Sequence, residues 1–139
     1  MEELRKIKLN IPSWAARLYI LISLAMIPWV IYLGYKLPLQ HISRNWDITW
    51  IGLDVAQISA LLTTGILARL SSIYMLFFAP IAGTLFLTDA WFDILGYKVG
   101  AFGFNQALLM AAFGEIPLTV MSFALTIHGL KRLHAKKYY

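Results

Sequence analysis

The stretch from Leu70 to Thr88 reads LSSIYMLFFAPIAGTLFLT and contains no Lys, Arg, Asp or Glu. The stretch from Leu18 to Tyr35 has none either, and Glu115 is the only such residue between Val99 and Leu130. Apolar runs of about 18 or more residues are typical of membrane-spanning helices, because roughly 20 helical residues are needed to cross the hydrocarbon core. The runs are continuous rather than alternating, which favours helices over strands.

The composition of the whole chain agrees with this interpretation. Of its 139 residues, 60% are hydrophobic and 14% are charged, whereas soluble domains average about 45–50% and about 25%. This composition excludes a soluble enzyme, a disordered chain and a nucleic-acid-binding module. The net charge of +5 lies in the flanks of the apolar runs, where Lys and Arg contact anionic lipid headgroups. Cysteine is absent, which excludes disulfides and cysteine-based metal sites.

We predict an all-α fold, an integral membrane four-helix bundle that forms a single transmembrane domain over residues 1–139. Only helices and closed barrels cross lipid, because every backbone polar group there needs a partner within the protein. The predicted helices span residues 14–33, 48–69, 72–95 and 102–130. The connection between the second and third helices is very short, which predicts a tight antiparallel pair.

The positively charged residues predict the orientation of the bundle. If both termini lie on one side, that side holds nine Lys and Arg residues: Arg5, Lys6, Lys8, Arg17, Arg69, Lys131, Arg132, Lys136 and Lys137. The other side holds three, namely Lys36, Arg44 and Lys98. The positive-inside rule therefore predicts that both termini are cytoplasmic, in a multi-pass protein of the cell (inner) membrane. We expect the basic termini to contact anionic lipid of the bilayer.

Four carboxylates lie inside the predicted spans. They are Asp54, Asp89, Asp93 and Glu115, and no Lys or Arg lies deep in any span to neutralise them. An ionisable group at membrane depth costs roughly 2.5–3.5 kcal/mol, so such groups usually face the bundle interior and serve a function.

Their depth follows from the helical rise of 1.5 Å per residue. Asp54 and Asp89 each lie about 9 Å inside the outer boundary, and Asp93 lies one turn from Asp89 on the same helix face. Three amide side chains join them in the outer half of the bundle, from the second and fourth helices: Gln57, Asn105 and Gln106. We hypothesise that the helix faces that carry these groups converge.

Carboxylates crowded into a low dielectric cannot all be ionised, so they would share a proton or bind a cation. Ligand sets made only of oxygen suit Ca²⁺, Mg²⁺, Mn²⁺ or Na⁺. The sequence therefore favours a polar cavity that opens to the outer side and binds a proton, a metal cation or a cationic ligand, for transport or sensing. No particular metal or cofactor is predicted.

Two other interpretations stay open. The acids could instead form hydrogen bonds that hold the helices together. The chain would then be an accessory or scaffolding subunit whose partner is another membrane protein or a second copy of the chain. An intramembrane enzyme that acts on lipid would use an Asp or Glu as acid and base, but no nucleophile or catalytic motif supports it. Pro28, Pro80 and Pro117 fall near the middles of three spans and predict kinks there.

Three segments carry a resemblance to a known family: Trp50-Ile-Gly-Leu-Asp54, Thr88-Asp-Ala-Trp-Phe-Asp93 and Glu115-Ile-Pro117. They resemble an uncharacterised family of small prokaryotic four-helix membrane proteins, over about residues 45 to 125. Leu53 departs from the pattern, because an aromatic residue usually precedes the first Asp in that family. The resemblance implies the four-helix topology and draws attention to the four acids, but it implies no reaction.

Overall fold

The computed structural model describes residues 8–9, 11–37, 44–96 and 103–137. Its helices are α2 (Ser13–Lys36), α3 (Trp46–Arg69), α4 (Met75–Leu95), α5 (Phe104–Met110), the π-helical turn η1 (Ala111–Glu115) and α6 (Ile116–Lys137). The last three follow one another without a break and form one long rod. Arg5, Lys6 and Lys98, which enter the charge count above, lie outside the described residues.

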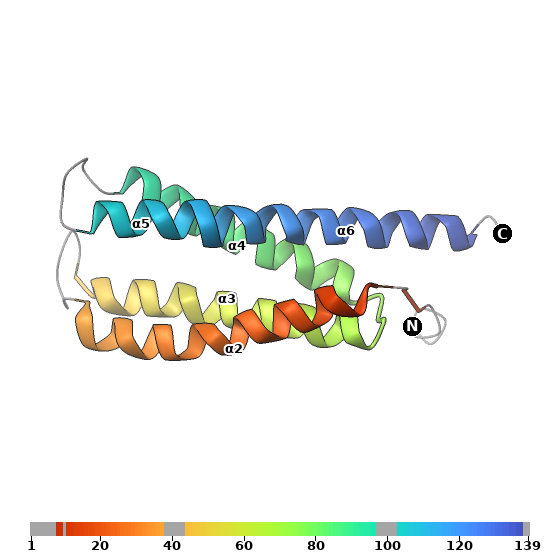
Figure 1. The fold of residues 1–139 in the computed structure, drawn as a ribbon, viewed down its shortest axis with the longest axis horizontal. Coiled ribbons are helices and arrows are strands. Elements are labelled where there is room, and N and C mark those ends of the chain that lie inside the picture. Colours follow the sequence, from red (N-terminus) through yellow and green to blue (C-terminus); the bar gives the residue numbers. More distant parts are fainter. Residues whose placement is uncertain (1–7, 10, 38–43, 97–102, 138–139) are drawn as a thin grey trace.

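The rods pack in chain order. α2 contacts α3, α3 contacts α4, and α4 contacts the rod formed by α5, η1 and α6. Figure 1 shows α4 crossing that rod obliquely, behind it in this view. We call the end where α2 begins and α6 ends the terminal end, and the end where α4 ends and α5 begins the loop end.

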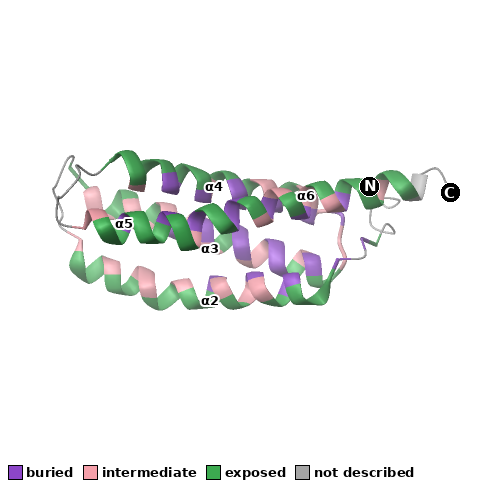
Figure 2. Cartoon of the chain, turned by 45° about the horizontal axis from the view of Figure 1, so that its top comes forward, coloured by how far each residue is buried: buried purple, intermediate pink, exposed green. Residues whose placement is uncertain are grey.

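Each of the four rods is long and apolar enough to cross a membrane, by length and composition. The candidate spans are Ser13–Lys36, Trp46–Arg69, Met75–Leu95 and Phe104–Ala135. Many large apolar side chains are exposed, among them Phe113, which is 80% exposed. Exposed positions, in green, follow the outer faces of the helices in Figure 2. A surface of this kind suits contact with lipid rather than water, as in a multi-pass membrane protein.

The four predicted helices are therefore present, with different ends. The third helix begins at Met75 rather than at residue 72, because Ser71 adopts a left-handed φ of 52° and breaks the chain out of helical geometry. Ser72 instead forms an isolated antiparallel bridge with Lys8, and the Leu9 N–H donates to the Ser71 carbonyl at 2.7 Å. The fourth helix continues past residue 130 to Lys137.

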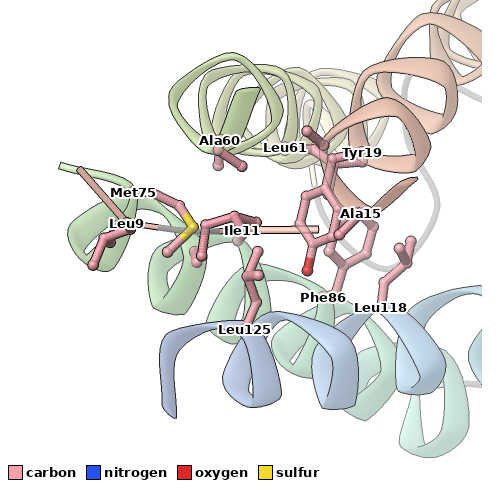
Figure 3. Packing of buried hydrophobic residues seen from close by; sticks show 14 residues of the cluster. Leu9, Ile11, Ala15, Tyr19, Ala60, Leu61, Met75, Phe86, Leu118 and Leu125 are labelled. Atoms are coloured by element: carbon pink, nitrogen blue, oxygen red, sulfur yellow. The ribbon is translucent and has the colours of Figure 1, made fainter. Parts of the chain in front are cut away.

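The apolar core lies in the half of the bundle nearer the terminal end. Its larger members are Leu9, Ile11, Tyr19, Leu61, Met75, Phe86, Leu118 and Leu125 (Figure 3). Alanines from α2, α3 and α4 are buried among them, and small residues of this kind let membrane helices approach closely. The other half of the bundle holds the buried acids.

Gly65 allows a close approach between α2 and α3. A Cβ atom at this position would lie 2.8 Å from Ile20 Cγ1, 3.0 Å from Ile20 N and 3.1 Å from Ala16 O. We expect Gly65→Ala to lower the melting temperature in detergent, because overpacking typically costs about 1–3 kcal/mol.

Gly52 in the same helix is the matched control for this prediction. A Cβ atom at Gly52 would meet nothing within 4 Å, so Gly52→Ala should leave the melting temperature unchanged or raise it, because alanine is the better helix former by about 1 kcal/mol. Equal melting temperatures for the two variants would show that the helices do not approach closely at Gly65.

Candidate functional site

Four carboxyl groups from three rods meet in the interior, nearer the loop end. Asp54 comes from α3, Asp89 and Asp93 come from α4, and Glu115 is the last residue of η1. Asp54, Asp89 and Glu115 are each only 7% exposed, and Asp93 is half-buried. The structure thus brings together the four carboxylates that the sequence placed at membrane depth.

The carboxyl groups act directly on one another. The side chains of Asp93 and Glu115 lie within hydrogen-bonding reach of one another. Because an ionised carboxylate only accepts hydrogen bonds, a hydrogen bond between the two requires a proton on one of them. Asp54 lies close enough to Asp89 and Asp93 to interact electrostatically with both. Glu115 interacts in the same way with the three aspartates.

Gln57 adds an amide to this group. Its side chain is fully buried, and its Nε2 donates to Asp89 Oδ2 at 2.7 Å. Gln57 lies three residues after Asp54, so both side chains lie on one face of α3. We refer to Asp54, Gln57, Asp89, Asp93 and Glu115 as the acid cluster.

The acid cluster has more hydrogen-bond acceptors than donors. Asp54 Oδ2, Gln57 Oε1 and Glu115 Oε2 are buried and have no hydrogen-bond partner among the described residues. An unsatisfied buried acceptor costs about 1–3 kcal/mol. The cluster is therefore suited to take up protons, donor molecules or a cation.

The central parts of the helices contain no Lys or Arg that could neutralise the acid cluster. Lys and Arg are absent from residues 18–35, 45–68, 70–95 and 103–130. Arg17, near the terminal end of α2, donates to the backbone carbonyl and the hydroxyl of Ser13. Arg69, at the terminal end of α3, is exposed.

Two predicted site residues do not join the acid cluster. The side chains of Asn105 and Gln106 are exposed on α5. The buried positions of this rod are Ala107, Ala111 and Glu115, which follow one another in steps of four residues along one face. Residues 105 and 106 fall on other faces of the helix. Their side chains therefore point away from the acid cluster, contrary to the prediction.

The π-helical turn carries Glu115 into the interior. Pro117 follows two residues later; it has no N–H for the Phe113 carbonyl, and its ring crowds that carbonyl. A wider turn relieves this crowding, and single π-helical turns recur at functional sites. The sequence indicated that acid and proline coincide here, but not the π geometry. Pro28 and Pro80 lie inside the continuous helices α2 and α4.

Aromatic rings lie beside the acid cluster toward the loop end. Trp50 of α3 packs edge-on against Phe92 of α4, with ring centroids 6.3 Å apart, and Trp46 packs against Trp50 at 5.5 Å. Trp50 is one turn before Asp54, so the rings join α3 and α4 just outside the carboxylates. Trp91 is 62% exposed, consistent with its position opposite Asp89 on α4.

Buried hydroxyl groups lie on the terminal side of the acid cluster. The Tyr19 hydroxyl and Ser122 Oγ are 2.9 Å apart, in a buried hydrogen bond between α2 and α6. Thr119 Oγ1 donates to the Gly83 carbonyl of α4 at 3.3 Å. These residues were not predicted as site residues, although Thr119 and Ser122 follow Glu115 at the helical spacings i+4 and i+7.

The arrangement of the acids bears on which ligand they could hold. Within the described ranges, no group of three Asp, Glu, His or Cys side chains is placed to hold a metal ion. The acid cluster resembles a set of carboxyl groups that share protons more than a preformed metal cage.

The chain matches no known protein-family profile, and no similar curated protein or solved structure was found. The resemblance carried by the Asp-Ala-Trp-Phe-Asp string stays a prediction.

Proposed function

We propose that the chain is a multi-pass protein of the cell membrane, with cytoplasmic termini, whose acid cluster reversibly binds a proton from the outer side for transport or sensing. The observation that carries this proposal is the close contact between the buried carboxyl groups of Asp93 and Glu115, beside Asp54 and Asp89. The orientation rests on the excess of Lys and Arg at the terminal end, which makes the loop end, nearer the acid cluster, the outer one.

The energetic argument concerns the ionised state of the acid cluster. Two unit charges 4 Å apart interact by about 4 kcal/mol at an effective dielectric constant of about 20. Asp54 and Asp89 add negative charge beside the Asp93–Glu115 pair, and Lys and Arg are absent from residues 18–35, 45–68, 70–95 and 103–130. Full ionisation is therefore strongly unfavourable, and a proton that the cluster holds relieves the repulsion.

The geometry favours a proton over a metal cation. A site that holds a metal ion mainly through protein ligands would need three or more side chains around one point, and the described residues offer no such group. A proton needs only the contact that Asp93 and Glu115 already make. A metal cation or a cationic organic ligand would require the side chains to rearrange.

Scaffolding is the second candidate function, because hydrogen bonds of these polar groups tie rods together. Gln57 joins α3 to α4, and Tyr19 joins α2 to α6. Interhelical hydrogen bonds of this kind hold membrane bundles together. In this alternative the chain would be an accessory subunit. A stoichiometric membrane partner captured in mild detergent, together with a stability that ignores pH, would favour it.

The proposal predicts that thermal stability in detergent falls as the pH rises between about pH 5 and about pH 8. The folded state holds a proton that the unfolded chain has lost over this range, so each such proton contributes about 1.4 kcal/mol of destabilisation per pH unit. The measurement is the melting temperature of the purified chain against pH, with Na⁺, Mg²⁺, Ca²⁺ and Mn²⁺ compared at constant ionic strength. A flat profile would contradict proton binding, and a selective shift by one ion would replace the proton with that metal.

A further inference from the structure

We propose that a polar path links the acid cluster to the cytoplasmic end of the bundle through Thr119, Ser122, Tyr19 and His128, and that the chain conducts protons across the membrane. This inference rests on the proposed function, because the acid cluster is the outer proton-binding site of the path. In this inference the acid cluster is the outer end of the path, and His128 is its cytoplasmic end.

The first part of the path follows one face of α6. Thr119 and Ser122 lie four and seven residues after Glu115, which is about 6 Å and about 10 Å along the helix axis. Both side chains are buried. Thr119 Oγ1 faces α4, where the Gly83 carbonyl accepts its hydrogen bond. Two hydroxyl groups thus continue from the acid cluster toward the terminal end.

The second part crosses the apolar core from α6 to α2. The hydrogen bond between the Tyr19 hydroxyl and Ser122 is fully buried, and either oxygen can be the donor. Figure 3 shows the Tyr19 hydroxyl directed toward α6, among Phe86, Leu118 and Leu125. A hydroxyl both donates and accepts hydrogen bonds, so this pair can receive a proton on one side and release one on the other.

The third part is a cavity between the beginning of α2 and α6. Its volume is about 290 Å³, and its lining is mostly apolar and includes Trp14 and Leu125, while Tyr19 and His128 offer an O–H and an imidazole nitrogen for hydrogen bonds. His128 Nε2 is buried and has no hydrogen-bond partner among the described residues. The space is large enough for water, since one molecule needs roughly 10–15 Å³ of such space.

The ionisable side chains along this path come from every rod. They are Tyr19 from α2, Asp54 from α3, Asp89 and Asp93 from α4, Glu115 from η1 and His128 from α6. A neutral imidazole carries one hydrogen-bond donor and one acceptor nitrogen, so His128 can form hydrogen bonds toward both the pocket and the cytoplasmic end. The outer part of the path is acidic, the middle consists of hydroxyls, and the inner part ends at a histidine.

Proton flux through the full-length chain tests the path. The chain is reconstituted in vesicles of phosphatidylcholine and phosphatidylglycerol, a potassium gradient with valinomycin drives proton entry, and an enclosed pH-sensitive dye reports the rate. We expect faster flux than in protein-free vesicles. Tyr19→Phe and Ser122→Ala should each slow it about tenfold, since they remove the hydroxyls that cross the core. Ser59→Ala is the control, because Ser59 is exposed and bonds only the Val55 carbonyl of its own helix.

The dependence of the melting temperature on pH separates the path from the acid cluster. Slow flux in both hydroxyl variants, with the pH dependence of wild type retained, supports the path and shows that these variants fold. The path is overturned if proton flux in either variant equals that of wild type, or if wild-type flux equals that of protein-free vesicles. In that case a melting temperature that still depends on pH leaves the proton site of the acid cluster intact. A wild-type melting temperature that ignores pH overturns both.

Discussion

Replacing Glu115 by glutamine is expected to flatten the pH dependence of thermal stability. In the wild-type chain the Glu115 and Asp93 carboxyl groups lie within hydrogen-bonding reach, and a hydrogen bond between them needs a proton. A glutamine amide can donate to Asp93 without that proton and carries no negative charge of its own. The variant should therefore lose a slope of about 1.4 kcal/mol per pH unit and become more stable than wild type at alkaline pH. Melting curves in detergent over a range of pH measure the effect.

Asp47→Asn is the matched control for this experiment. Asp47 lies in the first turn of α3, about two turns from Asp54 on the same helix, so the same chemical change is made away from the acid cluster. We expect this variant to keep the pH profile of wild type. If Glu115→Gln also kept that profile, the shared proton would not reside on Glu115 and Asp93.

Replacing Gln57 by leucine is expected to destabilise the bundle by about 3 kcal/mol. Leucine leaves Asp89 buried without the donor that now lies 2.7 Å away, and an unsatisfied buried acceptor of this kind costs about 1–3 kcal/mol, more when it is charged. The loss should grow as the pH rises, because ionised Asp89 needs the donor most. Thermal or denaturant unfolding in detergent measures it.

The double variant Gln57→Leu with Asp89→Leu tests whether this cost comes from the pair. Replacing both partners of a buried hydrogen bond by apolar groups of similar size can be nearly neutral. We therefore expect the double variant to recover most of the stability that Gln57→Leu loses. Costs that simply add would show that the two side chains do not depend on one another.

The helices of this chain could be predicted because long apolar runs with few charges are typical of membrane-spanning helices. Their ends could not, since they depend on local geometry. Ser71 leaves the helical region of backbone conformation, so Ser72 pairs with Lys8 instead of starting α4. At the other end, the run from Lys131 to Lys137 contains good helix formers and no Gly or Pro, so α6 continues through residues that were assigned to a flanking segment.

The depth of the acids could be predicted, but not which helix faces meet. Rise per residue gave the depth of Asp54 and Asp89, whereas rotation about each helix axis is set by close packing such as that at Gly65. Asn105 and Gln106 show the consequence: both lie near the loop end of the rod, but their side chains are exposed. The hydroxyls of Tyr19 and Ser122 were missed because each is an ordinary residue of an apolar helix until packing brings the two together.

Infrared spectroscopy of the purified chain tests most directly whether carboxyl groups from three rods share a proton. A protonated carboxyl group has a C=O stretching band that an ionised carboxylate lacks, and the band shifts in deuterated water. At neutral pH we expect this band in the wild-type chain, and we expect Glu115→Gln to weaken it while Asp47→Asn leaves it unchanged. Absence of a protonated carboxyl band from the wild-type chain at neutral pH would contradict the account.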